Sequence, residues 1–422
     1  MKISRINNNS QLIIYPTSKF KDLTISIQFH LPLTKENISK LALVSGIVVD
    51  QSQKYVNKVE LNKKLDKLYG ANYALTRTIK GNSLVCDFVF NGINGKYLNQ
   101  DILLDQLNFI KEMIYHPHAT QNAFTEVLFN EAKDNLLYQI KAKKDSAARY
   151  AIFQALKIYG GDTPLAFDSL GDKDEVMAID NHQLYQWYLE IIHNSYYEIA
   201  VIGDVDEALI KDFFIKNFPK VEQQINLVTY NKNKANLQSI SEEADIQQSQ
   251  LVMVFNGSIN MSDKDYYSLA VGCALFGQLP TSLLFSEIRE KRSLCYSIYS
   301  RLFVFEGGMY VATSMDSSKL AETEELVKTL FTQVQKGEYN PEMVKIAKDM
   351  IIDSLRGSYD DYQGILNLAF KLNHVNKDLT FDKTLELIND VKLSDISKAF
   401  KNLNLELVYT YKQRSSDENN SK

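Results

Sequence analysis

Hydrophobic and polar residues alternate in two early segments of the chain. Apolar side chains occupy every second position from Leu23 to Leu31 and again from Leu84 to Phe90. Successive side chains of a strand point to opposite faces, so each segment predicts a half-buried strand. Between them, apolar residues such as Leu41, Val44 and Val48 recur at helical spacing and predict a helix over 38–48.

The rest of the first half is predicted to be mainly helical and to end in a strand. A helix is expected over 59–69, another over 101–115 and further helices across 121–158. One more helix ends near Ile192, and the apolar stretch Glu198 to Ile202 predicts the closing strand. This order lacks the regular strand and helix alternation of a doubly wound parallel sheet.

The same order of elements restarts after residue 250. Apolar alternation predicts a strand over 251–255, helices over 266–276 and 282–292, and paired strands over 295–310. A helix and an apolar strand over 405–411 close this half, as they close the first. The second half of the chain is therefore expected to repeat the fold of the first.

A short stretch inside the helical patterns supports a duplication. Ala132-Lys133-Asp134, followed by two apolar residues, recurs 215 residues later as Ala347-Lys348-Asp349, also followed by two apolar residues. A period this long indicates a duplicated domain and not a solenoid. The predicted fold class is α+β, with two tandem homologous halves that each hold an antiparallel sheet covered by helices.

The predicted domains follow from this duplication. An N-terminal domain is expected over 1–221 and a C-terminal domain over 249–413. Residues 222–248 are rich in Gln, Asn, Lys, Ser and Glu and predict an exposed linker. The polar stretch 414–422 predicts a flexible tail.

Composition excludes some classes of partner and location but does not indicate a particular ligand. A net charge of −5 over 422 residues leaves no basic stripe that would follow a phosphate backbone, so nucleic acid is not an expected partner. Cys86, Cys273 and Cys295 have no CxxC spacing, which favours a reducing compartment, the cytoplasm. Residues 1–10 lack an apolar signal core, and no apolar run of about 18 residues occurs, so no membrane span is expected.

Several stretches, taken in their order and spacing, resemble the insulinase, pitrilysin and mitochondrial processing peptidase family of zinc peptidases. The segment Arg289 to Ile298 is similar to a family segment in which an Arg and a Tyr seven positions later contact the bound peptide. Gly307 to Tyr310 fits the strand that follows, and Ile202 to Val205 fits the turn that closes the first half. The resemblance spans nearly the whole chain, and it implies that Arg289 and Tyr296 bind substrate.

The catalytic motif of that family is missing from this chain. The family carries His-x-x-Glu-His on the first helix, where two imidazoles one turn apart bind zinc and the glutamate activates water. The matching helix, 38–48, contains no His and no Glu. The resemblance places the third ligand, a glutamate, near Leu137 to Gln139, where none stands. Glu126 and Glu131 lie upstream and are interpreted as surface residues.

The remaining candidate residues do not build a catalytic centre. None of the six histidines, His30, His116, His118, His182, His193 and His374, has a partner four positions away. A metal role for His116 and His118 in their loop is conceivable but lacks partners. Cys295 beside the basic segment is either an activated thiol or a buried small hydrophobe. GxSxG, Walker and GxGxxG motifs are absent. The prediction is no catalytic residue, no metal and no cofactor.

The resemblance implies a non-catalytic subunit that binds peptide and pairs with a zinc-bearing homologous peptidase as a heterodimer. It also implies a bacterial, low-GC Gram-positive member, in which such chains are sometimes linked to modification of elongation factor P. Two alternatives stay open. One is a self-sufficient metallopeptidase with relocated zinc ligands, and the other is a peptide-binding structural homodimer.

Overall fold

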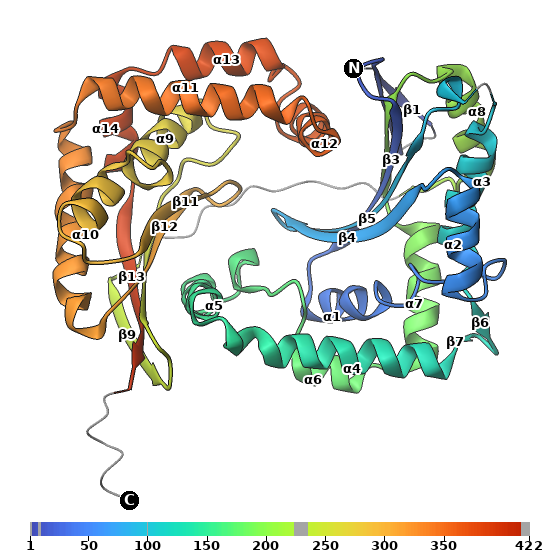
Figure 1. Cartoon of the computed structure of the whole chain (residues 1–422), viewed down its shortest axis with the longest axis horizontal. Coiled ribbons are helices and arrows are strands. Elements are labelled where there is room, and N and C mark those ends of the chain that lie inside the picture. Colours follow the sequence, from blue (N-terminus) through green and yellow to red (C-terminus); the bar gives the residue numbers. More distant parts are fainter. Residues whose placement is uncertain (1, 7–9, 99, 223–234, 415–422) are drawn as a thin grey trace, which may run out of the picture. The chain divides into compact units, whose positions relative to one another are not determined.

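The protein is described by a computed structural model that covers residues 2–6, 10–98, 100–222 and 235–414. These residues form two compact units, each built around its own mixed sheet with flanking helices (Figure 1). The α+β class predicted from the alternation pattern is confirmed.

The compact units do not follow the two continuous ranges predicted as domains. Residues 142–167 belong to the second unit, although they precede the end of the first half in sequence. Residues 361–369 belong to the first unit, although they lie in the second half. Each unit therefore includes one helical segment from the other half of the sequence, which no local pattern signals.

The first unit contains a sheet in the order β1-β2-β8-β3-β5-β4. Its strands are β1 (Lys2–Arg5), β2 (Gln11–Pro16), β3 (Asp22–Pro32), β4 (Asn72–Lys80), β5 (Ser83–Ile93) and β8 (Tyr197–Gly203), with a small hairpin of β6 (Ala119–Thr120) and β7 (Ala123–Phe124). Its helices are α1 (Lys35–Val44), α2 (Lys58–Lys67), α3 (Leu103–Tyr115), α4 (Glu126–Ala142), α6 (Lys173–Ala178), α7 (Asn181–Asn194), α8 (Glu207–Asn217) and α12 (Tyr362–Phe370). Pairing is antiparallel except between β2 and β8.

The central strand β3 is buried on both faces, so the predicted half-buried strand is wrong in this respect. Its apolar face packs with aromatic side chains, as in the edge-to-face pair of Phe29 and Phe88. Its polar residues Ser26 and Gln28 are also buried, because both donate hydrogen bonds to the buried carboxylate of Asp87 on β5. A polar side chain satisfied in this way tolerates burial.

The second unit contains a sheet in the order β11-β12-β10-β13-β9. Its strands are β9 (Gln238–Ala244), β10 (Ser249–Asn256), β11 (Ser297–Phe303), β12 (Gly308–Met315) and β13 (Asn404–Gln413). Its helices are α5 (Ala147–Gly160), α9 (Tyr266–Cys273), α10 (Leu320–Lys336), α11 (Pro341–Ser358), α13 (Phe381–Asn389) and α14 (Leu393–Lys401). The predicted helices over 266–276 and 282–292 run partly as π-helical turns, at Ala274–Gln278 and Phe285–Glu290.

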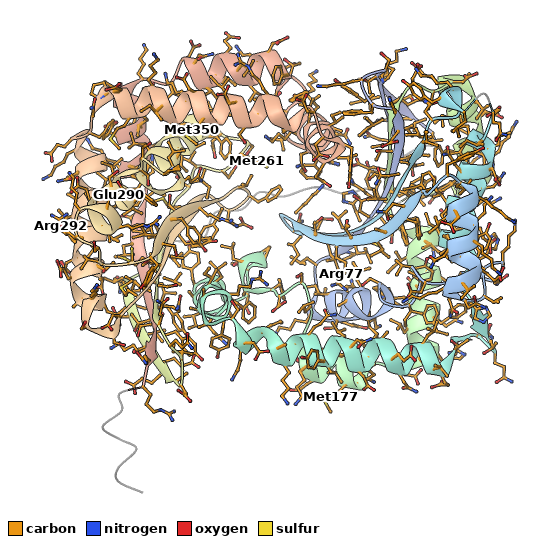
Figure 2. The ribbon with its side chains drawn as sticks, in the orientation of Figure 1. Arg77, Met177, Met261, Glu290, Arg292 and Met350 are labelled. Carbon is orange, nitrogen blue, oxygen red and sulfur yellow. The ribbon has the colours of Figure 1, made fainter. Side chains whose placement is uncertain are left out.

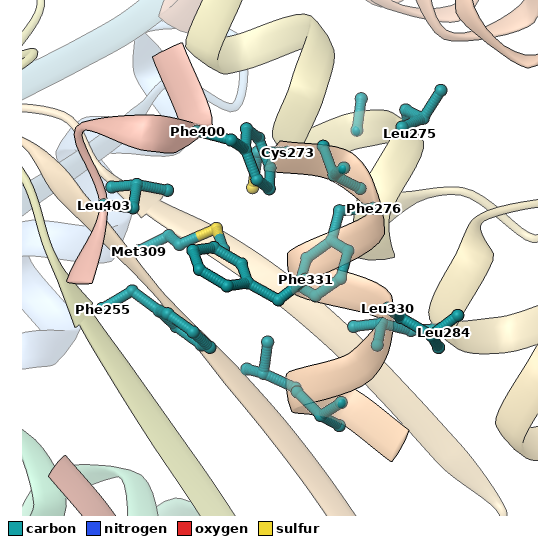
Figure 3. Close-up of a cluster of buried hydrophobic side chains, with 14 of the residues drawn as sticks. Phe255, Cys273, Leu275, Phe276, Leu284, Met309, Leu330, Phe331, Phe400 and Leu403 are labelled. Atoms are coloured by element: carbon teal, nitrogen blue, oxygen red, sulfur yellow. The ribbon is translucent and has the colours of Figure 1, made fainter. Parts of the chain in front are cut away.

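The core of the second unit lies between this sheet and helices α9, α10, α11 and α14 (Figure 3). Phe331 of α10 packs against Phe255 of β10, with ring centroids 4.5 Å apart, and against Phe276 and Phe400. The other face of the sheet is covered by α5, whose Ala151 and Ala155 join a second buried cluster with Val252 and other strand residues.

The strand order shows the duplication directly. Read from β2, the first sheet runs β2-β8-β3-β5-β4, and the second runs β9-β13-β10-β12-β11. In each, the first strand is parallel to the second and the remaining neighbours are antiparallel. Helices α4 and α11 begin 215 residues apart, at Glu126 and Pro341, which matches the shift of the repeated sequence stretch.

The predicted linker over 222–248 is wrong at its C-terminal end. Residues Gln238–Ala244 form β9 and pair in parallel with β13, so they belong to the second sheet. The alternation there is of polar and small residues at a sheet edge, which gives no strong apolar signal. Residues 223–234 of the linker and 415–422 of the predicted tail lie outside the described residues.

Candidate functional site

Helix α1 carries the position at which the zinc ligands are expected. Thr34 caps its start by accepting a hydrogen bond from the Asn37 N–H, and the helix ends at Val44. The side chains at 42, 45 and 46 have the spacing of His-x-x-Glu-His, but they are Ala42, Ser45 and Gly46. No side chain of this set binds zinc in the way imidazole or carboxylate does.

Helix α4 packs close to the end of α1. A β-carbon on Gly46 would lie 3.4 Å from Cβ of Ala132 on α4. Further along α4, where the resemblance places the third ligand, Leu137, Tyr138 and Gln139 offer no glutamate, and Tyr138 is 71% exposed. Ala132 supplies no ligand either, so the conclusion about the metal is unchanged.

The two upstream glutamates also stand away from a metal site. Both are exposed, as predicted for surface residues. Glu126 accepts a hydrogen bond from the Asn181 side chain, which ties the start of α4 to α7.

A guanidinium lies where the motif helix meets the sheet. Arg77 of β4 donates from one terminal nitrogen to the carbonyl of Ala42, at 2.8 Å, and to Oγ of Ser45, at 2.5 Å. Figure 2 shows Arg77 between β4 and α1. Burial lowers the pKa of Arg77, and the nearby Cys86 and Asp168 oppose that effect.

The sequence held a signal for Arg77 that the pattern analysis missed. Tyr73, Leu75, Arg77 and Ile79 all lie on the partly buried face of β4, while the residues between them are exposed. An arginine in the apolar phase of an alternating strand is unusual and therefore informative.

The histidines do not assemble around α1. His116 Nδ1 lies 3.0 Å from the Glu112 carboxylate, within the same chain segment. Among the residues that the structure describes, neither His116 nor His118 joins two other His, Cys, Asp or Glu side chains at metal-binding distances. A metal role for this loop therefore gains no support.

Arg289 and Tyr296 line one cavity in the second unit. The cavity has a volume of about 710 Å³ and is lined by Gln247, Gln248, Arg289, Ser293, Leu294, Cys295, Tyr296, Met315, Asp316, Ser318 and Lys319. Arg289 is the next-to-last residue of the π-helical turn Phe285–Glu290 and stacks over the Phe285 ring, with its guanidinium carbon 4.5 Å from the ring centroid. Tyr296, just before β11, is 75% exposed.

The charges of this cavity are mainly positive. Lys319 donates to the Ser293 carbonyl at 2.9 Å and so is held at the wall. The pKa of Asp316 is lowered by hydrogen bonds from Ser318, which satisfy its carboxylate. Lys291 and Arg292 instead pair with Glu287, which leaves Arg289 as the cation of this segment that faces the cavity. Sequence patterns did not indicate Lys319.

Cys295 behaves as a buried small hydrophobe. Burial raises the pKa of its thiol, although a hydrogen bond with Thr313 and the charges of Arg289 and Lys319 act in the opposite direction. A thiol with a raised pKa is largely protonated at neutral pH and is a poor nucleophile.

The helices of the described residues include none that is both long enough and apolar enough to span a bilayer.

The duplicated α+β units define a peptidase-like fold whose motif helix carries no zinc-binding side chain at the expected spacing. A model of the peptidase M16 inactive domain matches residues 178–351. The probable inactive metalloprotease YmfF of Bacillus subtilis is 27% identical over 403 residues, which cover 94% of this chain and 95% of that protein. The uncharacterized zinc protease YmxG of the same species is 20% identical over 69% of this chain and 70% of that protein.

Solved structures match the whole fold. A conserved protein from Enterococcus faecalis superposes with a TM-score of 0.92 and 25% identity, covering 98% of each chain. A protease from Helicobacter pylori superposes with a TM-score of 0.81 at 12% identity, covering 97% of this chain and 99% of that chain. The chain is thus similar to M16 peptidases in sequence and in fold over nearly its whole length. The missing ligands, the match to an inactive-domain model and the name of the B. subtilis relative support a non-catalytic protein.

Proposed function

We propose that this chain is the non-catalytic subunit of a peptidase, which holds peptide and pairs with a zinc-bearing homologue. One observation carries the proposal. Arg289 and Tyr296 line the same cavity of the second unit, while the motif positions of the first unit carry no metal-binding side chain. A chain that keeps the Arg and Tyr of the family's peptide-contact segment and lacks the zinc ligands is suited to binding without turnover.

The cavity favours the carboxyl end or the backbone carbonyls of a peptide. Among the described residues Arg289 forms no ion pair, so its guanidinium is available to a ligand. A guanidinium binds a carboxylate through two parallel hydrogen bonds, and Lys319 adds a second positive charge at the same wall. The exposed ring of Tyr296 offers an apolar surface and a hydroxyl to the same ligand.

The pairing rests on the family resemblance and on chemistry. A subunit without zinc does not lower the pKa of a bound water, so hydrolysis of a held peptide needs a second chain that supplies the metal. A zinc-bearing homologue of the same fold is the partner that meets this need.

Peptide binding is tested with an unstructured, fluorescently labelled peptide in two forms, one with a free terminal carboxylate and one amidated. Fluorescence anisotropy should show weaker binding of the amidated form. Arg289→Met should weaken binding of the free form by about tenfold or more, because a charge-assisted hydrogen bond is lost. Arg301→Met, which removes an exposed arginine from β11, is the matched control and should leave binding unchanged. Equal binding by the Arg289 variant and the native chain would remove the basis of this site.

Pairing is tested by co-expression with a zinc-bearing homologue from the same genome. Size-exclusion chromatography with light scattering should show a complex of one copy of each chain. A chain that elutes alone at every concentration in the presence of the homologue would contradict the pairing.

A further inference from the structure

We propose that Arg77 takes over the place of a metal ion in this chain: its guanidinium is the cation that holds the end of α1 against the edge strand β4, and its charge keeps divalent metal out. The juxtaposition that carries this inference lies entirely within the first unit. It joins the motif positions Ala42 and Ser45 to a side chain from a different element.

The first step concerns the backbone at the end of α1. The last carbonyls of a helix lack an intrahelical donor and need another partner. Here the Ser45 N–H donates to the Leu41 carbonyl, and the Gly46 N–H donates to the Leu43 carbonyl. The Gly46 N–H thus bypasses the Ala42 carbonyl, its usual partner in a continuing helix. That carbonyl instead accepts from Arg77 and from the Ser45 hydroxyl, at 2.8 and 2.9 Å.

The second step concerns charge. An arginine side chain stays protonated in proteins even when burial disfavours its charged form. The C-terminal end of a helix carries a partial negative charge, so a guanidinium placed there is stabilised. Arg77 therefore does two things that a bound metal ion would do at this position. It neutralises the carbonyl end of the motif helix, and it links that helix to the sheet.

The third step concerns what the site accepts. Ala42 and Gly46 offer no donor atom to a metal, and Ser45 Oγ already accepts from Arg77. A divalent cation brought to these residues would also meet the fixed positive charge of Arg77 at short range, which is strongly unfavourable away from bulk water. The missing metal ligands and the charge of Arg77 thus both disfavour a bound divalent cation.

The first test compares hydrogen exchange in the full chain and in the variant Arg77→Met, which keeps much of the side-chain volume and removes the charge. Amides over 41–48 and in β4 should exchange about tenfold faster or more in the variant, because the Ala42 carbonyl loses its charged donor. Arg77→Lys should restore part of the protection. Arg301→Met, from the corresponding edge strand β11, should leave these amides unchanged. Native exchange rates at 41–48 in Arg77→Met would overturn the proposal.

The second test asks whether the charge excludes metal, which a merely structural role would not do. The pair Ala42→His and Gly46→His places two imidazoles at the i, i+4 spacing of a zinc site. Made together with Arg77→Ala, it should gain several degrees in melting temperature on addition of zinc chloride, whereas the same pair beside Arg77 should gain little. Equal zinc shifts in both backgrounds, including no shift in either, would overturn the exclusion of metal by Arg77.

Discussion

At the scale of single residues, the first unit buries the carboxyl group of Asp87 in its sheet. Asp87 is 7% exposed and accepts hydrogen bonds from Ser26 and Gln28. Burial raises the pKa of Asp87 from 3.8 to about 6, and these hydrogen bonds together with the charge of Lys80 limit the rise. The native state therefore holds the Asp87 proton more tightly than the unfolded state does.

The sign of the resulting pH dependence follows from linkage. Between pH 4 and 6 the native state binds more protons than the unfolded state at this position, so stability falls as the pH rises through this window and levels off above it. Asp87→Asn removes the titration. The free energy of unfolding of the native chain should fall by about 3 kcal/mol relative to the variant between pH 4 and pH 7. Urea unfolding across this range checks it, and parallel pH profiles for the two chains would show that Asp87 does not titrate there.

At the residue level, Arg289 and Tyr296 were selected by the resemblance to a family segment with an Arg and a Tyr seven positions later. The structure brings both to one cavity, and their binding role stays a proposal. The contact of Ala132 with the end of α1 was not predicted, because helical periodicity does not say which residue of one helix meets another. Lys319 was missed as well, since a lysine before a surface helix looks like any solvated charge.

At the scale of helices and strands, periodicity predicted the strands with large apolar side chains and failed at the sheet edge and at the covering helices. β10 was predicted as a strand from apolar alternation, a pattern typical of one buried face, yet all of its residues are buried. The reason is α5, which comes from the first half of the sequence and covers the second face of that sheet. The residue pattern of β10 cannot show that α5, about a hundred residues earlier in the sequence, covers this face.

The covering role of α5 makes a direct prediction. Ala155 is fully buried against the sheet, whereas Ile158 on the same helix is 36% exposed. Ala155→Glu places an unpaired charge in the buried cluster and should cost about 3 kcal/mol or more, or prevent folding. Ile158→Glu adds the same charge at the surface and should cost about 1 kcal/mol or less. Chemical unfolding followed by circular dichroism measures both, and similar losses for the two variants would contradict the packing of α5.

At the scale of the whole chain, the two units share a strand order but differ in their candidate functional residues. The first unit carries helix α1, which lacks the zinc-binding motif and whose Ala42 carbonyl accepts a hydrogen bond from Arg77 of β4. The second unit carries the cavity with Arg289 and Tyr296. The duplication was predictable because both copies kept the same order of apolar segments. The membership of 142–167 and 361–369 in the opposite units was not, because it depends on tertiary packing alone.

The central claim is that this peptidase-like chain has no catalytic metal. The most direct measurement is the metal content of the native chain by elemental mass spectrometry, after purification without chelators or a histidine tag, with and without zinc in the growth medium. The account predicts zinc well below one equivalent per chain in both samples. One tightly held equivalent, removed only by a chelator, would contradict it and would mean that the chain binds zinc through residues other than those of α1.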